Sequence, residues 1–143
     1  MLKGINKVVS PDLVHALCSM GHGQTIAVVD ANYPIDHCKA RVIRLDGVLA
    51  TDIVDAILTL FPLEVGHKDA ACRMIVDEDP DKTLPILEEY AAIVARREPN
   101  APALLRLTPD DFKARAADGF AIVQSGDARP YGNILLKKGI VLN

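Results

Sequence analysis

Several residue types are scarce in this chain of 143 residues. It has no tryptophan and only three tyrosines and three phenylalanines, which disfavours a binding surface built from stacked aromatic rings. Its three cysteines, Cys18, Cys38 and Cys72, are odd in number and widely spaced. We therefore expect neither a disulfide framework nor a zinc site.

Charge and hydropathy exclude further classes. The formal net charge of −3 gives no electrostatic reason to expect a nucleic-acid partner. Half of the residues are apolar, yet no apolar stretch approaches the roughly 20 residues of a membrane span, and the N-terminus lacks a signal-peptide core. These features predict a soluble, cytoplasmic protein with no membrane partner.

Motifs for common cofactors are also missing. The chain has no G-x-G-x-x-G, no Walker loop, no G-x-S-x-G elbow and no metalloprotease pair of histidines. We therefore expect no redox cofactor, nucleotide or metal ion. His15, His37 and His67 are interpreted as surface or satisfied core residues.

What the chain does contain is an alternation of strand and helix patterns within one domain, residues 1–143. Expected strands are 26–29, 41–45, 72–76, 104–107, 120–123 and 133–136. Helices are expected after the cap-type residues Ser10, Thr51, Thr83 and Thr108, and Cys18 is expected in the core. The last two strands are too close for a helical crossover, so the fold class predicted is a three-layer α/β domain with a mixed sheet.

One short strand is bracketed by reactive groups. His22 lies between Gly21 and Gly23, where a helix should end, and Asp30 follows the apolar run 26–29. Ligands in open α/β sheets bind beyond the carboxyl ends of strands, so Asp30 lies where a pocket is expected. The alternative is that the helix dipole favours His22 and that Asp30 merely opens a turn. Spacing alone leaves both interpretations open.

A second segment, residues 125–133, links the last two strands. Tyr131 and Asn133 offer a hydroxyl and an amide on either side of Gly132, a set suited to an uncharged polyol. The alternative is a hairpin loop with a packed tyrosine.

Together these stretches resemble a known family. The sequences MGHG at 20–23, DANYP at 30–34, IRLDG at 43–47 and YGNILLKKG at 131–139 resemble those of the L-fucose mutarotase and D-ribose pyranase family. The likeness runs nearly end to end and includes MLKG at 1–4 and the Ser10-Pro11 cap. It implies a ribose-pyranase-like fold and a cofactor-free isomerase that interconverts anomers, or ring forms, of a free monosaccharide such as L-fucose. It also implies homo-oligomeric rings, often decamers, with sugar pockets near subunit contacts.

The resemblance also implies roles for residues. His22 is then the acid and base of catalysis, and Asp30, Tyr131, Gly132 and Asn133 touch the sugar. Histidine suits ring opening and closure, because its ordinary pKa of about 6.5 leaves both protonation states accessible near neutrality. Asp30 would orient the imidazole or a sugar hydroxyl, and Tyr131 could relay a proton. No covalent nucleophile or metal is needed.

One departure bears on the substrate. Pro109 stands where fucose-type relatives carry a sugar-binding arginine and ribose-type relatives a histidine, and Arg106 is a candidate to replace that contact. The ends of the chain look fucose-type, whereas Thr108, Phe112 and Lys113 look more like the ribose branch. The alternative function is a non-catalytic monosaccharide-binding or transport-associated protein that kept the pocket and lost the chemistry.

Overall fold

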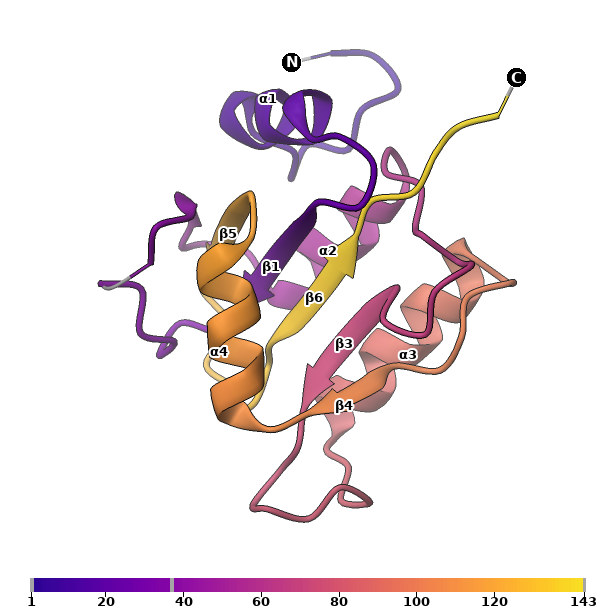
Figure 1. The fold of residues 1–143 in the computed structure, drawn as a ribbon. Coiled ribbons are helices and arrows are strands. Elements are labelled where there is room, and N and C mark those ends of the chain that lie inside the picture. Colours follow the sequence, from indigo (N-terminus) through magenta and orange to yellow (C-terminus); the bar gives the residue numbers. More distant parts are fainter. Residues whose placement is uncertain (1, 37, 143) are drawn as a thin grey trace.

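Helices and strands alternate along the chain, as the sequence predicts (Figure 1). The computed structural model describes residues 2–36 and 38–142, so the expectation for His37 lies outside the described residues. The elements are α1 (Pro11–Ser19), β1 (Thr25–Val29), β2 (Arg41–Leu45), α2 (Ala50–Leu58), β3 (Ala71–Met74), α3 (Pro85–Arg97), β4 (Leu105–Leu107), α4 (Pro109–Asp118), β5 (Ala121–Ser125) and β6 (Ile134–Lys137).

The strands form one mixed sheet in the order β2-β5-β1-β6-β3-β4. β6 runs antiparallel to both of its neighbours, β1 and β3, and the other neighbouring pairs are parallel. Because β1 lies between β5 and β6, the link 126–133 crosses the end of β1. The hairpin interpretation of this link is therefore wrong, and the crossing brings residues 131–133 next to Asp30.

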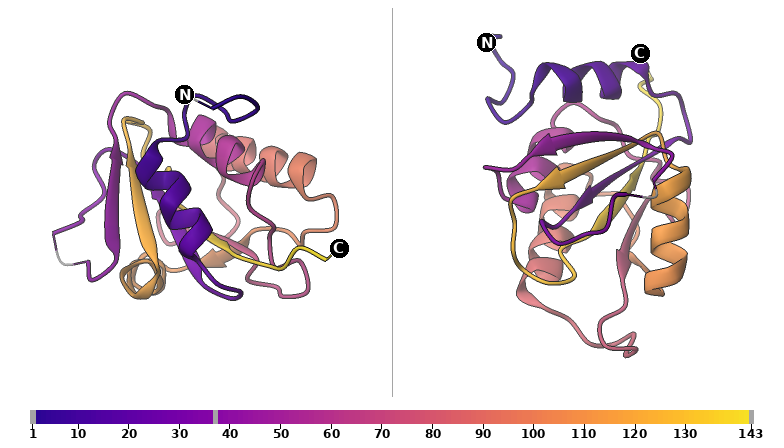
Figure 2. Two further views of the ribbon diagram at one scale, coloured as in Figure 1. Left: turned by 90° about the horizontal axis from the view of Figure 1, so that it is seen from above. Right: turned by 90° about the vertical axis from the view of Figure 1, so that its left-hand side faces the viewer.

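Helices cover both faces of the sheet, which confirms the three-layer α/β architecture (Figure 2). α2 and α3 pack together on one face, and α4 lies on the other. Alternate β1 side chains enter the two cores: Ile26 and Val28 on the α2 and α3 side, Ala27 and Val29 on the α4 side. This burial on both faces explains the continuous apolar run of the strand.

Two helix starts follow the local sequence signals. The Ser10 hydroxyl accepts a hydrogen bond from the Leu13 amide at 3.2 Å, and the Thr108 hydroxyl accepts one from the Asp111 amide at 3.2 Å. Each satisfies one of the free amides of a first helical turn. The predicted caps of α1 and α4 are confirmed.

The other two predicted caps are wrong. α2 begins at Ala50, one residue before Thr51, and its first amide donates to the Asp127 carboxylate at 3.3 Å. α3 begins at Pro85 after an extended Leu84, so Thr83 makes no cap. A carboxylate far away in sequence serves α2, and proline at the first position of α3 has no amide to satisfy.

The buried face of α1 also differs from the expected one. Leu13, Ala16, Leu17 and Met20 are buried, whereas Cys18 is exposed. The apolar stripe therefore continues from Leu17 to Met20 and not through Cys18, because residues three and four apart share a helix face. Among the described residues, no helix is long and apolar enough to cross a membrane.

Candidate active site

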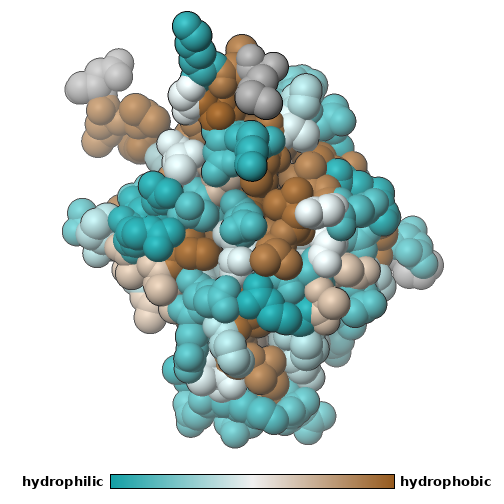
Figure 3. All heavy atoms as spheres, turned by 180° about the vertical axis from the view of Figure 1, so that it is seen from behind, coloured by the Kyte–Doolittle hydropathy of each residue, from teal (hydrophilic) through white to brown (hydrophobic). Residues whose placement is uncertain are grey.

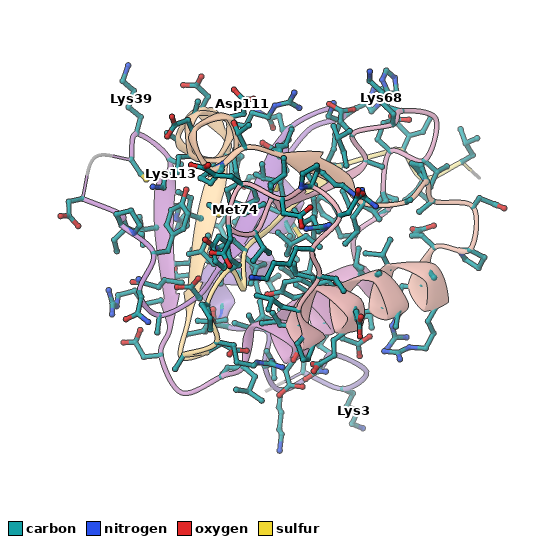
Figure 4. All side chains as sticks on the ribbon, turned by 90° about the horizontal axis from the view of Figure 1, so that it is seen from below. Lys3, Lys39, Lys68, Met74, Asp111 and Lys113 are labelled. Carbon is teal, nitrogen blue, oxygen red and sulfur yellow. The ribbon has the colours of Figure 1, made fainter. Side chains whose placement is uncertain are left out.

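A cavity of about 340 Å³ opens at the carboxyl ends of β1 and β3. Asp30, Tyr131 and Asn133, all predicted site residues, line it, together with Pro109 and Lys113 from α4. Figure 4 looks at this end of the molecule, with Lys113 on α4 and Met74 at the end of β3 labelled. This is the edge at which α/β sheets place their ligands.

Asp30 is held in the cavity wall by the backbone around it. Only 6% of the residue is exposed, and its carboxylate accepts a hydrogen bond from the Asn32 amide at 2.9 Å. Burial raises the pKa of Asp30, and the hydrogen bonds from Asn32 and Asn133 offset part of this rise. The site thus holds a desolvated carboxyl group suited to accepting a hydrogen bond from a polyol hydroxyl.

Tyr131 adopts a backbone conformation that non-glycine residues seldom take. Its φ is +58°, and its hydroxyl donates to the Asp77 carboxylate at 3.1 Å. Asp77 also has a positive φ, of +47°, and pairs with Lys82, which together with Tyr131 lowers the Asp77 pKa. Such left-handed residues cost free energy and cluster at functional sites.

Gly132 and Asn133 tie this link to the rest of the fold. The Asn133 side-chain oxygen accepts from the Asp30 amide at 2.9 Å. The carbonyl of Gly132 accepts from the hydroxyl of Tyr90, a fully buried residue of α3, at 2.9 Å. A Cβ on Gly132 would lie 2.8 Å from Ile86 Cδ1 and 3.1 Å from the Arg129 carbonyl oxygen, so the position is tight for any larger residue.

Asp127 and Arg129 form the frame of the link. Asp127 is 1% exposed and pairs with Arg129, with a shortest N–O distance of 2.7 Å. The guanidinium lowers the pKa of the Asp127 carboxyl, which also accepts the Ala50 amide of α2. The Asp127 carbonyl accepts from the Ala31 amide at 2.8 Å, so the link is fixed to the chain just after Asp30.

His22 does not lie in this cavity. It precedes β1, whereas Asp30 follows it, and a five-residue strand spans roughly 16 Å. Its side chain is 57% exposed, and its Nε2 is in hydrogen-bond contact with the carboxylate of Glu64. Within one chain the structure therefore brings Asp30, Tyr131, Gly132 and Asn133 together and leaves His22 at the opposite end of β1.

Arg106 also lies elsewhere. It comes from the edge strand β4, pairs with Asp81 at 2.7 Å and lines a different hollow, next to α3. The cation that lines the Asp30 cavity is Lys113. The structure thus gives no support to Arg106 as the replacement for the contact missing at Pro109.

From the sequence, no role is predicted for three residues that contact the cavity or the predicted site residues: Lys113 lines the cavity, Asp77 contacts Tyr131, and Glu64 contacts His22. Lys113 could have been found, because it lies four residues after Pro109 and shares its helix face. Asp77 and Glu64 carry no local signal, since each meets its partner, Tyr131 or His22, only through the tertiary fold. Within residues 2–36 and 38–142, no group of three His, Cys, Asp or Glu side chains is arranged to hold a metal ion.

Known proteins resemble this chain over nearly its whole length. Residues 3–141 match the RbsD / FucU transport protein family. The fucose mutarotase of Mus musculus is 40% identical over 144 residues, covering 96% of this chain and 94% of its own. The structure of FucU from Bifidobacterium longum has a TM-score of 0.90 at 34% identity, covering 98% of this chain and 100% of that one.

A third relative has a sugar bound. The crystal structure of the fucose mutarotase from Streptococcus pneumoniae in complex with L-fucose has a TM-score of 0.86 at 36% identity. The alignment covers 99% of this chain and 100% of that one. The match therefore extends over nearly the whole of both chains.

Proposed function

Because the chain belongs to the RbsD / FucU transport protein family, we propose that it is a sugar mutarotase that interconverts the anomers of a free monosaccharide, with L-fucose as the first candidate. The observation that carries this proposal is the cavity in which Asp30, Tyr131 and Asn133 converge at the end of β1. Its polar groups bind hydroxyls, and mutarotation of an uncharged sugar requires no more than hydroxyl binding and proton transfer.

His22 supplies the proton transfer in this proposal, and a second copy of the chain brings it to the cavity. Two observations support an intersubunit site: His22 is largely exposed, and it lies a full strand length from Asp30. A heterologous contact, with the His22 end of one copy against the Asp30 end of the next, generates a ring when the rotation between successive copies closes. We expect a homo-oligomeric ring, with a decamer as the specific form.

Apolar surface near the chain ends is consistent with self-association. Val141 and Leu142 are 75% and 83% exposed, and Figure 3 shows apolar atoms in the segment that projects at this end. Exposed apolar patches of this kind mark protein contacts. Light scattering at micromolar concentration tests the assembly, and a monomer would exclude the shared site.

The cavity also bears on substrate choice. Pro109 offers no hydrogen bond to a sugar, whereas the Lys113 ammonium, on the same face of α4, is a donor for a sugar hydroxyl. We propose that Lys113 takes the place of the cationic contact that fucose-type relatives have at position 109. D-Ribose and D-galactose therefore belong in the panel of test sugars beside L-fucose.

Magnetisation-exchange NMR tests the activity directly. The wild type should accelerate exchange between the anomers of at least one sugar in the panel, and His22→Ala should abolish this acceleration. His15→Ala is the matched control, because His15 is an exposed histidine of α1 that contacts Arg41, outside the cavity lining. Sugar binding without faster exchange by the wild type would favour the non-catalytic alternative.

A further inference from the structure

The imidazole of His22 has one protein partner among the described residues, the carboxylate of Glu64. The contact joins His22 Nε2 to Glu64 Oε2, and the Glu64 side chain is 15% exposed against 57% for His22. No partner of His22 Nδ1 is found within residues 2–36 and 38–142. One ring nitrogen is thus occupied by protein and the other is left for a ligand.

The fold holds Glu64 and His22 against each other through one stretch of backbone. The Glu64 amide donates to the Lys137 carbonyl at 3.0 Å, and the Gly23 amide, next to His22, donates to the Lys138 carbonyl at 2.8 Å. The last residue of β6 and the residue after it therefore hold the Glu64 loop and the Gly23 loop in place. Gly23 has a φ of +81°, a left-handed conformation that glycine adopts without strain.

Further contacts make this frame rigid. The Lys138 ammonium donates to the carbonyls of Leu17 at 2.8 Å and Met20 at 2.6 Å, which fixes the end of α1 just before His22. On the other side, Gly139 donates to the Pro62 carbonyl at 2.7 Å, just before Glu64. The hydrogen bond with His22 is the main cause of the lowered pKa of Glu64, so the carboxylate is charged near neutrality.

We propose that Glu64 is a positioning residue of the mutarotase reaction: its carboxylate accepts the Nε2 proton of His22 and leaves the Nδ1 lone pair to act on the sugar. The hydrogen bond made by one ring nitrogen selects the tautomer, and hence which nitrogen reacts. This inference rests on the proposed function and deepens it, since it assigns the reacting atom of the catalytic histidine.

The proton balance of the step follows from this assignment. Nδ1 takes the proton of the anomeric hydroxyl, and the imidazolium gives that proton to the ring oxygen as the C1–O5 bond breaks and the C1=O bond forms. After rotation about C1–C2, closure on the other face reverses both transfers. The Glu64 carboxylate stabilises the transient imidazolium and itself takes no proton, as an orienting carboxylate does in other acid–base sites.

The alternative is an ordinary surface ion pair, which contributes little to stability and nothing to turnover. The two interpretations differ for Glu64→Gln, which keeps the side chain's size, removes its charge and can donate to Nε2 as well as accept from it. If Glu64 positions His22, kcat should fall about 10–100-fold, the range known for the loss of a carboxylate that orients a metal-bound histidine, with KM within about twofold. Glu88→Gln makes the same chemical change at an exposed residue of α3 that does not line the Asp30 cavity and has no contact with His22, so it should leave kcat unchanged.

The experiment combines two readouts on the full-length protein. Long-range ¹⁵N–¹H correlation spectra of the wild type should show His22 as the Nε2–H tautomer, and Glu64→Gln should weaken this preference. Anomer exchange should give the kcat loss in Glu64→Gln. An active wild type with the Nδ1–H tautomer, or an unchanged kcat in Glu64→Gln, would overturn the positioning role alone. A wild type that shows the Nε2–H tautomer but accelerates no sugar would overturn the proposed function and the role of Glu64 with it.

Discussion

Replacing Tyr90 by phenylalanine removes one oxygen atom from beneath the site. Tyr90 is fully buried in α3, and its hydroxyl donates to the Gly132 carbonyl at 2.9 Å. The ring stays in place in Tyr90→Phe, so packing is preserved and only this hydrogen bond is lost. The Gly132 carbonyl then remains buried without its donor.

The size of the effect follows from that unsatisfied carbonyl. Leaving a buried polar group without its partner costs about 1–3 kcal/mol. For a chain of this length, such a loss lowers the thermal midpoint by roughly 3–9 °C. Because Gly132 lies between Tyr131 and Asn133, we also expect KM for the sugar to rise while kcat changes less.

Urea and thermal unfolding at one fixed protein concentration measure the loss of stability, and anomer-exchange NMR measures KM. Tyr33→Phe is the matched control for stability alone, since Tyr33 lines the cavity: Tyr33 is 6% exposed, and no protein partner of its hydroxyl is found in the described part of the chain. Its removal should leave the free energy of unfolding within about 0.5 kcal/mol of the wild type. If Tyr90→Phe were as stable as Tyr33→Phe, the hydrogen bond would not hold the link, and the reasoning would be wrong.

Three further predictions concern the cavity, the link and the helix pair. Lys113→Met keeps the apolar stem of the side chain and should raise KM about fivefold through the loss of one hydrogen bond to the sugar, with kcat unchanged in exchange NMR. An unchanged KM would show that Lys113 does not contact the sugar. Gly132→Ala places a Cβ 2.8 Å from Ile86 Cδ1 and should lower the free energy of unfolding in urea by about 1–2 kcal/mol. An unchanged free energy of unfolding would mean that the Ile86 side chain moves aside without cost. Arg97 and Arg96 lower the pKa of Asp55 from 3.8 to about 2. The ion pairs of the Asp55 carboxylate therefore stabilise the folded protein above pH 3.8, and this stabilisation is lost as pH falls through about 2. The stability difference between wild type and Asp55→Asn, about 1 kcal/mol at neutral pH, should therefore shrink in acid unfolding curves, and a constant difference would contradict the pairing.

The sequence predicts a helix start correctly where the group that caps the helix is close to it along the chain. Ser10 and Thr108 cap helices because each hydroxyl reaches an amide three residues ahead, a relation contained in the sequence itself. α2 starts one residue before Thr51 because its first amide is satisfied by Asp127, 77 residues away. No local pattern at Thr51 reveals that partner.

In the candidate site, too, the sequence predicts the residues but not the contacts that depend on the tertiary fold. Asp30 and residues 131–133 were predicted, and the sheet order explains why they meet: β1 lies between the two strands that the link joins. The sequence placed His22 before and Asp30 after the strand 26–29, but it could not show whether the two side chains share one pocket within a single chain, which they do not. Nor could it show Glu64 beside His22, since their contact depends on the backbone of Lys137 and Lys138 at the end of β6.

The central claim is a sugar site that two copies of the chain complete, one with Asp30 and the other with His22. Complementation between His22→Ala and Asp30→Asn tests it most directly, with each variant purified alone and then refolded as a mixture. Each variant alone should be inactive, and random assembly of an equal mixture should restore both groups at about a quarter of the sites, with that share of the wild-type exchange rate. A mixture no more active than its two parents, although light scattering shows mixed oligomers, would contradict the shared site.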